Sequence, residues 1–233
     1  VRNVLGGRGQ PLWSYTSPAN RKWYPEKVKQ YPFDLNLAAK TLADSGFTKL
    51  DGRLLGPAGN PVEFNILTPA ENDTRIGMLN VIKRDLLRIG VVVHILPIPF
   101  NDIISALRKT RDFDCVLLGW GTAIPPDPSF SRNVIMSSGQ DHYWRPPREK
   151  PATEWERRMD ELMTKNASTI DYAARKGHSD KLFQIFSDFQ PQIQLVVTYD
   201  AAVARNNIGN FQPSALGPKA HWNIEALYFR DRK

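Results

Sequence analysis

The chain has 233 residues, of which 41% are hydrophobic and 10% aromatic, enough apolar side chains for one large domain or two small ones. No apolar stretch approaches the roughly twenty residues that a membrane-spanning helix needs, so no such helix is expected. The net charge is +7, but the 31 basic residues are dispersed among 24 acidic ones. A solvated basic surface is the simplest interpretation, and a nucleic-acid-binding module is the weaker alternative.

The N-terminal residues have the pattern of a helix end, with apolar Val4 and Leu5 followed by Gly6 and Gly7. In the sequence given, this helix has an end but no start. No initiator Met and no signal-peptide pattern precede it. We therefore expect the chain to be a piece of a longer protein.

Residues 8–33 are rich in Pro, Trp and Tyr and are expected to form loops. Asp34 then has the position of an N-cap, and the apolar spacing after it predicts a helix that ends at Gly46. The pair Asp51-Gly52 is typical of a tight turn, so we expect a short hairpin before residue 60.

Three apolar runs predict strands at residues 62–67, 91–96 and 113–118. The first alternates with a period of two, and the second is nearly continuous, as in a strand covered on both faces. Helical spacing predicts one helix between the first two runs and a shorter one before the third, capped by Asn101 or Asp102. Because this order of elements dictates a parallel sheet, the expected class is α/β.

After Trp120 the sequence shows no regular periodicity until about residue 151, which is typical of a functional or covering loop. Capping patterns at Thr153 and Asp171 then predict two helices. Residues 193–199 read as a further strand. The tail after Asn206 has only weak periodicity.

No catalytic constellation is visible in the sequence. The four histidines have no metal-ligand spacing, and no G-x-S-x-G motif is present. Cys115 shows no sign of activation and is expected to pack inside its strand. The glycine-rich residues 6–9 lack the flanking strand and the Gly-Lys-Ser/Thr of a phosphate loop. The sequon at Asn166 is a pattern that is common by chance.

The carboxyl ends of the three predicted strands carry a different set of residues. Parallel strands end at one edge of a sheet, so segments 68–72, 97–101 and 119–122 are expected to come together. This rim offers an aromatic ring, flexible backbone and neutral side chains, which suit binding of a small polar or peptidic ligand. A core anchor is the alternative role for Trp120, but its flanking glycines favour close approach by a ligand. The candidate contacts are Trp120, Gly119, Gly121, Thr122, Asn72, Asn101 and Asp127.

Several segments of the chain resemble one family. Residues 31–47 are similar to the pattern Y-P-x-D-x-x-x-A-x-x-L-L-x-x-A-G-F of the family 5 extracellular solute-binding proteins, the dipeptide/oligopeptide-type receptors of ABC transporters. Further similarities follow in the family's order: Asp51-Gly52, Gly59-Asn60-Pro61, residues 82–91, Asp112-Phe113-Asp114, Gly119-Trp120, Asp127-Pro128 and residues 221–225. Each motif alone is weak, but their shared order over nearly the whole chain is a specific signal.

The resemblance implies one lobe of a two-lobe periplasmic-binding-protein-like fold, with a mostly parallel βαβαβ core and added helices. Residues 1–205 would form the C-terminal ligand-binding lobe, and residues 206–233 a tail that returns toward the missing N-terminal lobe. Apolar surface would then be exposed on the tail.

The implied function is non-catalytic binding of a peptide-like or other small polar ligand between two lobes. The partner would be the membrane permease of an ABC importer, and the location periplasmic or extracellular, with lipid anchoring left open. No cofactor, no metal and no nucleic-acid partner is expected.

One departure from the family pattern concerns the solute. For peptide-binding members the resemblance implies an aspartate, shortly after the Gly-Trp pair, that takes the peptide's ammonium group. Here no acid precedes Asp127, and a buried ammonium without a carboxylate is costly. Unless Asp127 or Glu71 substitutes, free dipeptides are not expected, whereas blocked peptides, oligosaccharides and metal chelates stay open. The competing class is an independent α/β enzyme domain with its active site at the same strand edge.

Overall fold

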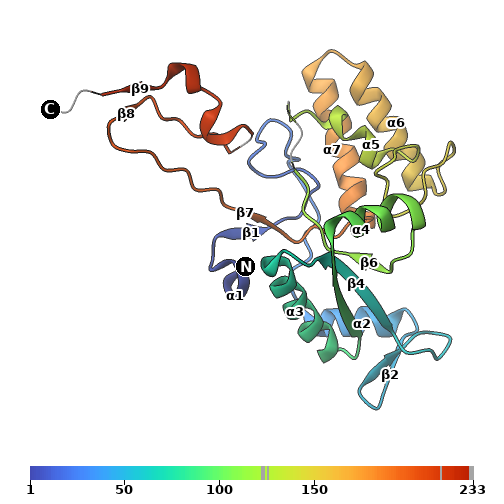
Figure 1. Cartoon of the computed structure of the whole chain (residues 1–233). Coiled ribbons are helices and arrows are strands. Elements are labelled where there is room, and N and C mark those ends of the chain that lie inside the picture. The colour runs from blue at the N-terminus through green and yellow to red at the C-terminus, as the bar shows by residue number, and fades with distance from the viewer. Residues whose placement is uncertain (122–123, 125, 216, 231–233) are drawn as a thin grey trace. The chain divides into compact units, whose positions relative to one another are not determined.

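The computed structural model describes residues 1–121, 124, 126–215 and 217–230. The chain divides into two compact units (Figure 1). Tyr31–Trp120 is called the sheet unit, and Val1–Gln30 with Gly121–Lys233 is called the helical unit. Within the described ranges no helix is long and apolar enough to cross a membrane.

The sheet unit begins with a capped helix and a hairpin. The Asp34 carboxylate accepts the backbone N–H of Leu37 at 2.9 Å, which caps the helix as the sequence predicts. The hairpin turns at Asp51 and Gly52, whose φ values are 48° and 79°, the left-handed geometry that a two-residue hairpin turn requires. The elements are α2 (Leu35–Asp44), β2 (Thr48–Leu50) and β3 (Arg53–Leu55).

A three-stranded parallel sheet forms the centre of this unit. β4 lies in the middle, β5 pairs with one of its edges and β6 with the other. The predicted strand–helix–strand–helix–strand order is therefore confirmed, and with it the α/β class. In chain order the elements are β4 (Glu63–Pro69), α3 (Asp73–Arg88), β5 (Val92–Ile98), α4 (Phe100–Ser105), the π-helical turn η1 (Ala106–Thr110) and β6 (Cys115–Val116).

Two details of this segment differ from the sequence prediction. The Cys115 side chain is exposed rather than packed in the sheet, because β6 forms only a two-residue edge strand. The N-cap of α4 is Pro99, so the prediction that Asn101 or Asp102 caps this helix was wrong. The backbone carbonyl of Pro99 already accepts the N–H of Asp102 at 3.0 Å, which starts the helix before either side chain could cap it.

Packing of α3 on the sheet fixes the register of the strands. Phe64 pairs with Val93 and Ile66 with Ile95, so alternation places these four side chains on one face. They pack in one cluster with Leu79 of α3, which is 1% exposed. The fully buried members Leu79 and Val93 each contribute about 1.5–3 kcal/mol, so the cluster stabilises the pairing of the strands.

The helical unit is built around α6 and α7, which lie side by side (Figure 1). Both predicted caps are present: Thr153 Oγ1 accepts the N–H of Glu156 at 3.3 Å, and the Asp171 carboxylate accepts that of Ala174 at 2.8 Å. The elements before the tail are α1 (Arg2–Leu5), β1 (Gly9–Pro11), η2 (Pro128–Ser131), α5 (Arg132–Ile135), α6 (Glu154–Ser168), α7 (Tyr172–Phe189) and β7 (Val196–Thr198).

The sequence predicted only one of the two strands of a small sheet in this unit. β7 is the predicted strand, shortened to Val196–Thr198, and it pairs antiparallel with β1 at Gly9–Pro11. The β1 residues were expected to be loop, because a three-residue strand has no periodicity of its own and exists only through this pairing.

The core of the helical unit also contains a buried acid. Glu156 is 1% exposed, and its carboxylate accepts from Thr153 Oγ1 at 2.9 Å and from the N–H of Ala152 at 3.1 Å. Arg145 Nε lies 2.9 Å from its other oxygen. Burial alone would raise the pKa of Glu156, but the hydrogen bonds of Thr153 and the charge of Arg145 hold that pKa below its ordinary value. The surrounding apolar core includes Met159, Met163, Leu182, Phe183 and Phe186.

The tail leaves apolar side chains exposed, as expected. Its two strands pair antiparallel, Ile208 with Phe229 and Gly209 with Tyr228. Trp222 is 48% exposed and Phe229 78% exposed. The boundary near residue 205 and the missing partner lobe stay predictions. The tail elements are β8 (Ile208–Gly209), η3 (Lys219–His221), η4 (Ile224–Ala226) and β9 (Tyr228–Phe229).

Candidate functional site

Hydrogen bonds join the three strand ends of the sheet unit into one rim. The N–H of Ala70 donates to the Ile98 carbonyl at 2.9 Å, and the N–H of Leu117 donates to the Leu67 carbonyl at 2.8 Å. Thr68, which is fully buried, donates its hydroxyl to the Leu117 carbonyl at 3.3 Å. The chain leaves central β4 toward β5 and returns on its other side at β6, so the rim lies at a switch point of the topology.

The two asparagines expected on this rim have different environments. Asn72 is the N-cap of α3, and its side-chain oxygen accepts the N–H of Arg75 at 2.9 Å, which leaves its amide N–H groups for other partners. Asn101 lies on the exposed surface of the first turn of α4. Both lie beyond the carboxyl ends of their strands, as predicted, and their contact with a ligand stays a prediction.

Trp120 lies at the end of the segment that follows β6 and is 48% exposed. A core anchor would be buried, so this degree of exposure contradicts the alternative role considered for the ring. A half-exposed indole at the rim can cover an apolar or planar part of a ligand.

Gly119 leaves room for the side chain of Arg75, a residue that the sequence did not point to. A Cβ atom at Gly119 would lie 2.7 Å from Arg75 Nη2, so the guanidinium of Arg75 lies directly against this glycine. Arg75 is partly buried in the first turn of α3. The available sequence signal was a basic residue in the first helical turn, where the helix dipole disfavours a cation.

Three further candidate residues are Gly121, Thr122 and Glu71, and no contact among the described residues assigns them to the site. Gly121 is exposed, and a Cβ atom there would meet nothing within 4 Å. Thr122 lies outside the residues that the structure describes. Glu71, considered as a substitute acid, is exposed at the end of β4 in the sheet unit.

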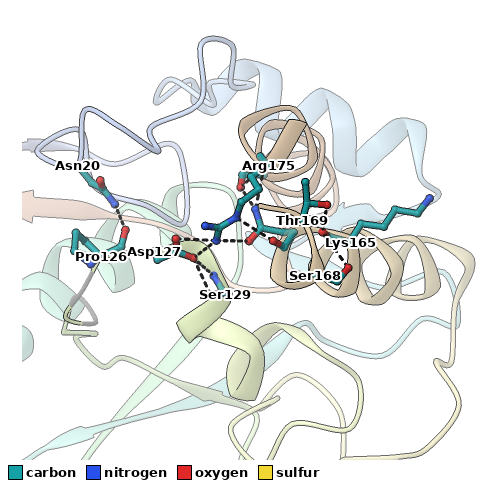
Figure 2. A network of polar contacts seen from close by, with 10 residues as sticks. Asn20, Pro126, Asp127, Ser129, Lys165, Ser168, Thr169 and Arg175 are labelled. Carbon is teal, nitrogen blue, oxygen red and sulfur yellow. Dashed lines mark hydrogen bonds and ion pairs between the residues drawn. The ribbon is translucent and has the colours of Figure 1, made fainter. Parts of the chain in front are cut away.

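Asp127 is held by two residues of the helical unit (Figure 2). Its carboxylate caps η2 by accepting the N–H of Ser129 at 3.0 Å, and Arg175 Nη2 donates to its two oxygens at 2.6 and 2.8 Å. Burial would raise the pKa of Asp127, but the hydrogen bonds of Ser129 and Arg175 outweigh it and lower that pKa. The Asp127 carboxylate is therefore already paired, and a ligand ammonium would have to compete with Arg175.

Arg175 is fixed in turn by its neighbours. Its Nε donates to the Asn166 carbonyl at 3.0 Å, and its guanidinium lies 5.1 Å from the centre of the buried Trp23 ring. The Asn166 amide is fully buried and donates to Ser179 Oγ at 2.7 Å, so the sequon is not accessible in this fold. Beside this network lies an open hollow of about 560 Å³, whose lining includes Lys22 and Phe130. The Asp127–Arg175 pair thus forms part of the wall of the hollow, and the Asp127 carboxylate there is already paired.

Within the part of the chain that the structure covers, no three His, Cys, Asp or Glu side chains converge on a possible ion site. The rim of the sheet unit instead combines backbone groups, an amide, an indole and a guanidinium, which suits binding of a small polar molecule.

Known proteins are similar to this chain in sequence and in fold. The family profile described as bacterial extracellular solute-binding proteins, family 5 Middle, matches residues 1–143. A probable ABC transporter-binding protein from Deinococcus radiodurans is 31% identical over 203 residues, which are 82% of this chain and 34% of that protein.

Two solved structures show the likeness in fold. The oligopeptide-binding protein AppA from Bacillus subtilis, in complex with a nonapeptide, has a TM-score of 0.74 at 22% identity over 99% of this chain and 44% of its own. NikA from Brucella suis, in complex with Fe(III)-EDTA, has a TM-score of 0.77 at 20% identity over 98% of this chain and 44% of its own. The chain thus spans less than half the length of these relatives. Because the family profile matches more than half of its residues, this chain belongs to the family 5 bacterial extracellular solute-binding proteins.

Proposed function

We propose that the chain forms the C-terminal part of a receptor for an ABC importer, which binds a peptide-like or other small polar solute without transforming it. The observation that carries this proposal is the rim of the sheet unit, where the half-exposed Trp120 follows the carboxyl ends of three parallel strands. Family membership adds the class of function, since the relatives are solute-binding proteins.

The proposed roles follow the chemistry of each residue. Trp120 stacks on or walls the ligand, and Gly119 and Gly121 offer backbone hydrogen bonds. Thr122 would add a hydroxyl. Asn72 and Asn101 would contribute amide groups at the ends of β4 and β5.

Asp127 has a more limited role in this proposal. Because Arg175 and Ser129 already occupy its carboxylate, it acts mainly by fixing the segment that follows Gly121. It contacts a ligand only if an ammonium group displaces Arg175. Solutes without a free ammonium group are therefore favoured.

We further propose the domain arrangement of a two-lobe receptor. Residues 1–205 would form the C-terminal lobe, and residues 206–233 would return to an N-terminal lobe that the 233 residues do not contain. The support is the fraction of the relatives' length that the chain covers and the exposure of Trp222, Ile224 and Phe229 on the tail. In such a receptor the ligand bridges the lobes and stabilises the closed state that a membrane permease recognises. The receptor would act in the periplasm or outside the cell, and a lipid anchor would be compatible with that location.

The test is mass spectrometry of small molecules released from the intact receptor after gentle purification, followed by calorimetric titration with the solute identified. Trp120→Ala is expected to weaken binding by about 1–3 kcal/mol, the effect of losing a buried aromatic anchor. Phe33→Ala is the matched control, because Phe33 is an exposed aromatic residue just before α2 and does not follow any of the three strands. An unchanged dissociation constant for Trp120→Ala would remove this residue from the site. A tightly held nucleotide or redox cofactor in place of a transported solute would favour the enzyme alternative.

A further inference from the structure

Arg75 has an unusual position on the rim of the sheet unit. Its Nη2 atom occupies the space in front of Gly119, where any side chain would meet it. No hydrogen bond or ion pair of its guanidinium is formed with any residue that the structure describes; its backbone N–H is bonded to Asn72. Glu71 and Asp73, the nearest acids in sequence, are both exposed and form no ion pair with it. The positive charge of Arg75 is thus partly buried and uncompensated.

Two other arginines of the same helix are compensated or favourably placed. In the same helix Arg84 donates to Asp85 at 3.0 Å, and Arg88 lies in the last turn, where the helix dipole favours a cation. Arg75 lies in the first turn, where the same dipole is unfavourable for it. A cation that is placed against the helix dipole and has no compensating contact in the protein is typical of a functional position.

We infer that Arg75 is the anion-binding residue of the rim and that it receives a carboxylate group of the solute. The planar guanidinium offers parallel N–H groups that match the two oxygens of a carboxylate. Gly119 leaves room for the guanidinium beside Trp120, so charge recognition and ring contact are adjacent along the chain. This inference rests on the proposed function, and it narrows the solute to a molecule that carries a carboxylate.

A requirement for a carboxylate on the solute decides among the solute classes that the sequence leaves open. Asp127, the first acid after the Gly-Trp pair, is already paired with Arg175, whereas Arg75 has no ion pair with any residue that the structure describes. A blocked peptide with a free carboxylate, or a carboxylate chelate, fits this charge pattern. A neutral oligosaccharide carries no charged group that would pair with Arg75.

The direct test is a ¹⁵N NMR titration of the arginine side chains of the intact receptor with sodium acetate, with acetamide as the neutral isostere. The Arg75 signal, identified by its loss in Arg75→Lys, is expected to shift with acetate in a saturable manner and to stay in place with acetamide. Arg84, exposed on the same helix, is the internal control and is expected to show only a small, linear shift. An Arg75 signal that does not respond to acetate, or that responds equally to acetamide, would overturn the inference. Saturation by inorganic phosphate alone would also overturn it, because the site would then select a different anion.

Two variants connect this subsite to the transported solute. Arg75→Gln is expected to raise the dissociation constant of the solute about ten- to a hundredfold, the range for a lost hydrogen bond to a charged group. Arg84→Gln is expected to leave it unchanged. Gly119→Ala displaces the mobile end of the Arg75 side chain rather than backbone, so it should reduce the acetate response without lowering stability.

The outcomes separate the two proposals. A transported solute bound equally well by Arg75→Gln would refute the anion subsite and leave the receptor function intact. Acetate binding at Arg75 in a protein that carries and binds no transported solute would refute the receptor function and leave the anion subsite intact.

Discussion

Arg175 in the helical unit and Arg75 in the sheet unit place the same side chain in opposite electrostatic situations. Arg175 donates to Asp127 and to the Asn166 carbonyl and lies over Trp23, so its hydrogen-bonding capacity is largely used within the protein. Arg75 lies against Gly119 and has no such partner among the described residues. The helical unit thus pairs its partly buried charges within the protein, whereas the charge of Arg75 is the one that we propose for the anion subsite.

The acids of the two units differ in the same way. In the helical unit Glu156 and Asp127 are both held by arginine and by backbone N–H groups, and both have a lowered pKa. At the rim of the sheet unit Glu71 is exposed and Asn72 uses its oxygen to cap α3. Removing a charged group from the helical unit should therefore cost stability, whereas removing Arg75 from the rim should cost binding.

The largest expected effect on stability comes from Glu156→Ala. The change removes the side chain of a capping box, the acceptor of the Ala152 N–H and the Thr153 hydroxyl, and the ion-pair partner of Arg145, which should lower the free energy of unfolding by about 2–3 kcal/mol. Urea-induced unfolding monitored by circular dichroism measures this loss. Glu161→Ala on the same helix is the matched control, because Glu161 is half-exposed and its ion pair with Arg157 should contribute less than about 1 kcal/mol. Equal losses for the two variants would contradict the comparison.

Asp127→Asn tests the second paired acid through its pH dependence. The variant should be about 1–2 kcal/mol less stable than the wild type at pH 7, because a charge-assisted pair with Arg175 is lost. The folded pKa of Asp127 lies below the ordinary value of 3.8, so the stability from this group is complete above about pH 4 and disappears as the pH falls through the lowered pKa. The gap between wild type and variant should therefore close in acid. Urea unfolding at a series of pH values measures the gap, and a gap that stays constant down to pH 2 would show that Asp127 is not the titrating group.

The smallest effect is expected from Gly177→Ala on α7. Gly177 is exposed within the helix, and a Cβ atom there would meet nothing within 4 Å. Alanine has the higher helix propensity and a less flexible unfolded state, so the variant should be about 0.5–1 kcal/mol more stable. Combined with Glu156→Ala it should restore about that amount, since the two sites share no contact. A destabilised Gly177→Ala variant would indicate that this face of α7 has a partner that the 233 residues do not include.

Much of the rim could be anticipated from the sequence, but the roles of its residues could not. Parallel strand order alone places Asn72, Asn101 and Trp120 beyond the carboxyl ends of β4, β5 and β6. The partner of Asp127, by contrast, is Arg175, which lies 48 positions away along the chain. The contact between Arg75 and Gly119 likewise joins the first turn of α3 to the segment that follows β6. Pairings of this kind have no signal in local spacing, because they depend on where packing brings distant segments.

By itself the sequence determined the elements whose formation is local. Apolar periodicity and the caps Asp34, Thr153 and Asp171 specify helices, and the alternating runs at β4 and β5 specify strands, because these signals act within a few residues. Only the tertiary structure decided that Gly9–Pro11 is a strand, that Cys115 is exposed, and that Asp127 is paired while Arg75 has no ion pair among the residues described. The physical reason is that burial and electrostatic pairing are properties of three-dimensional neighbours, and a charge acquires its role from the groups that surround it.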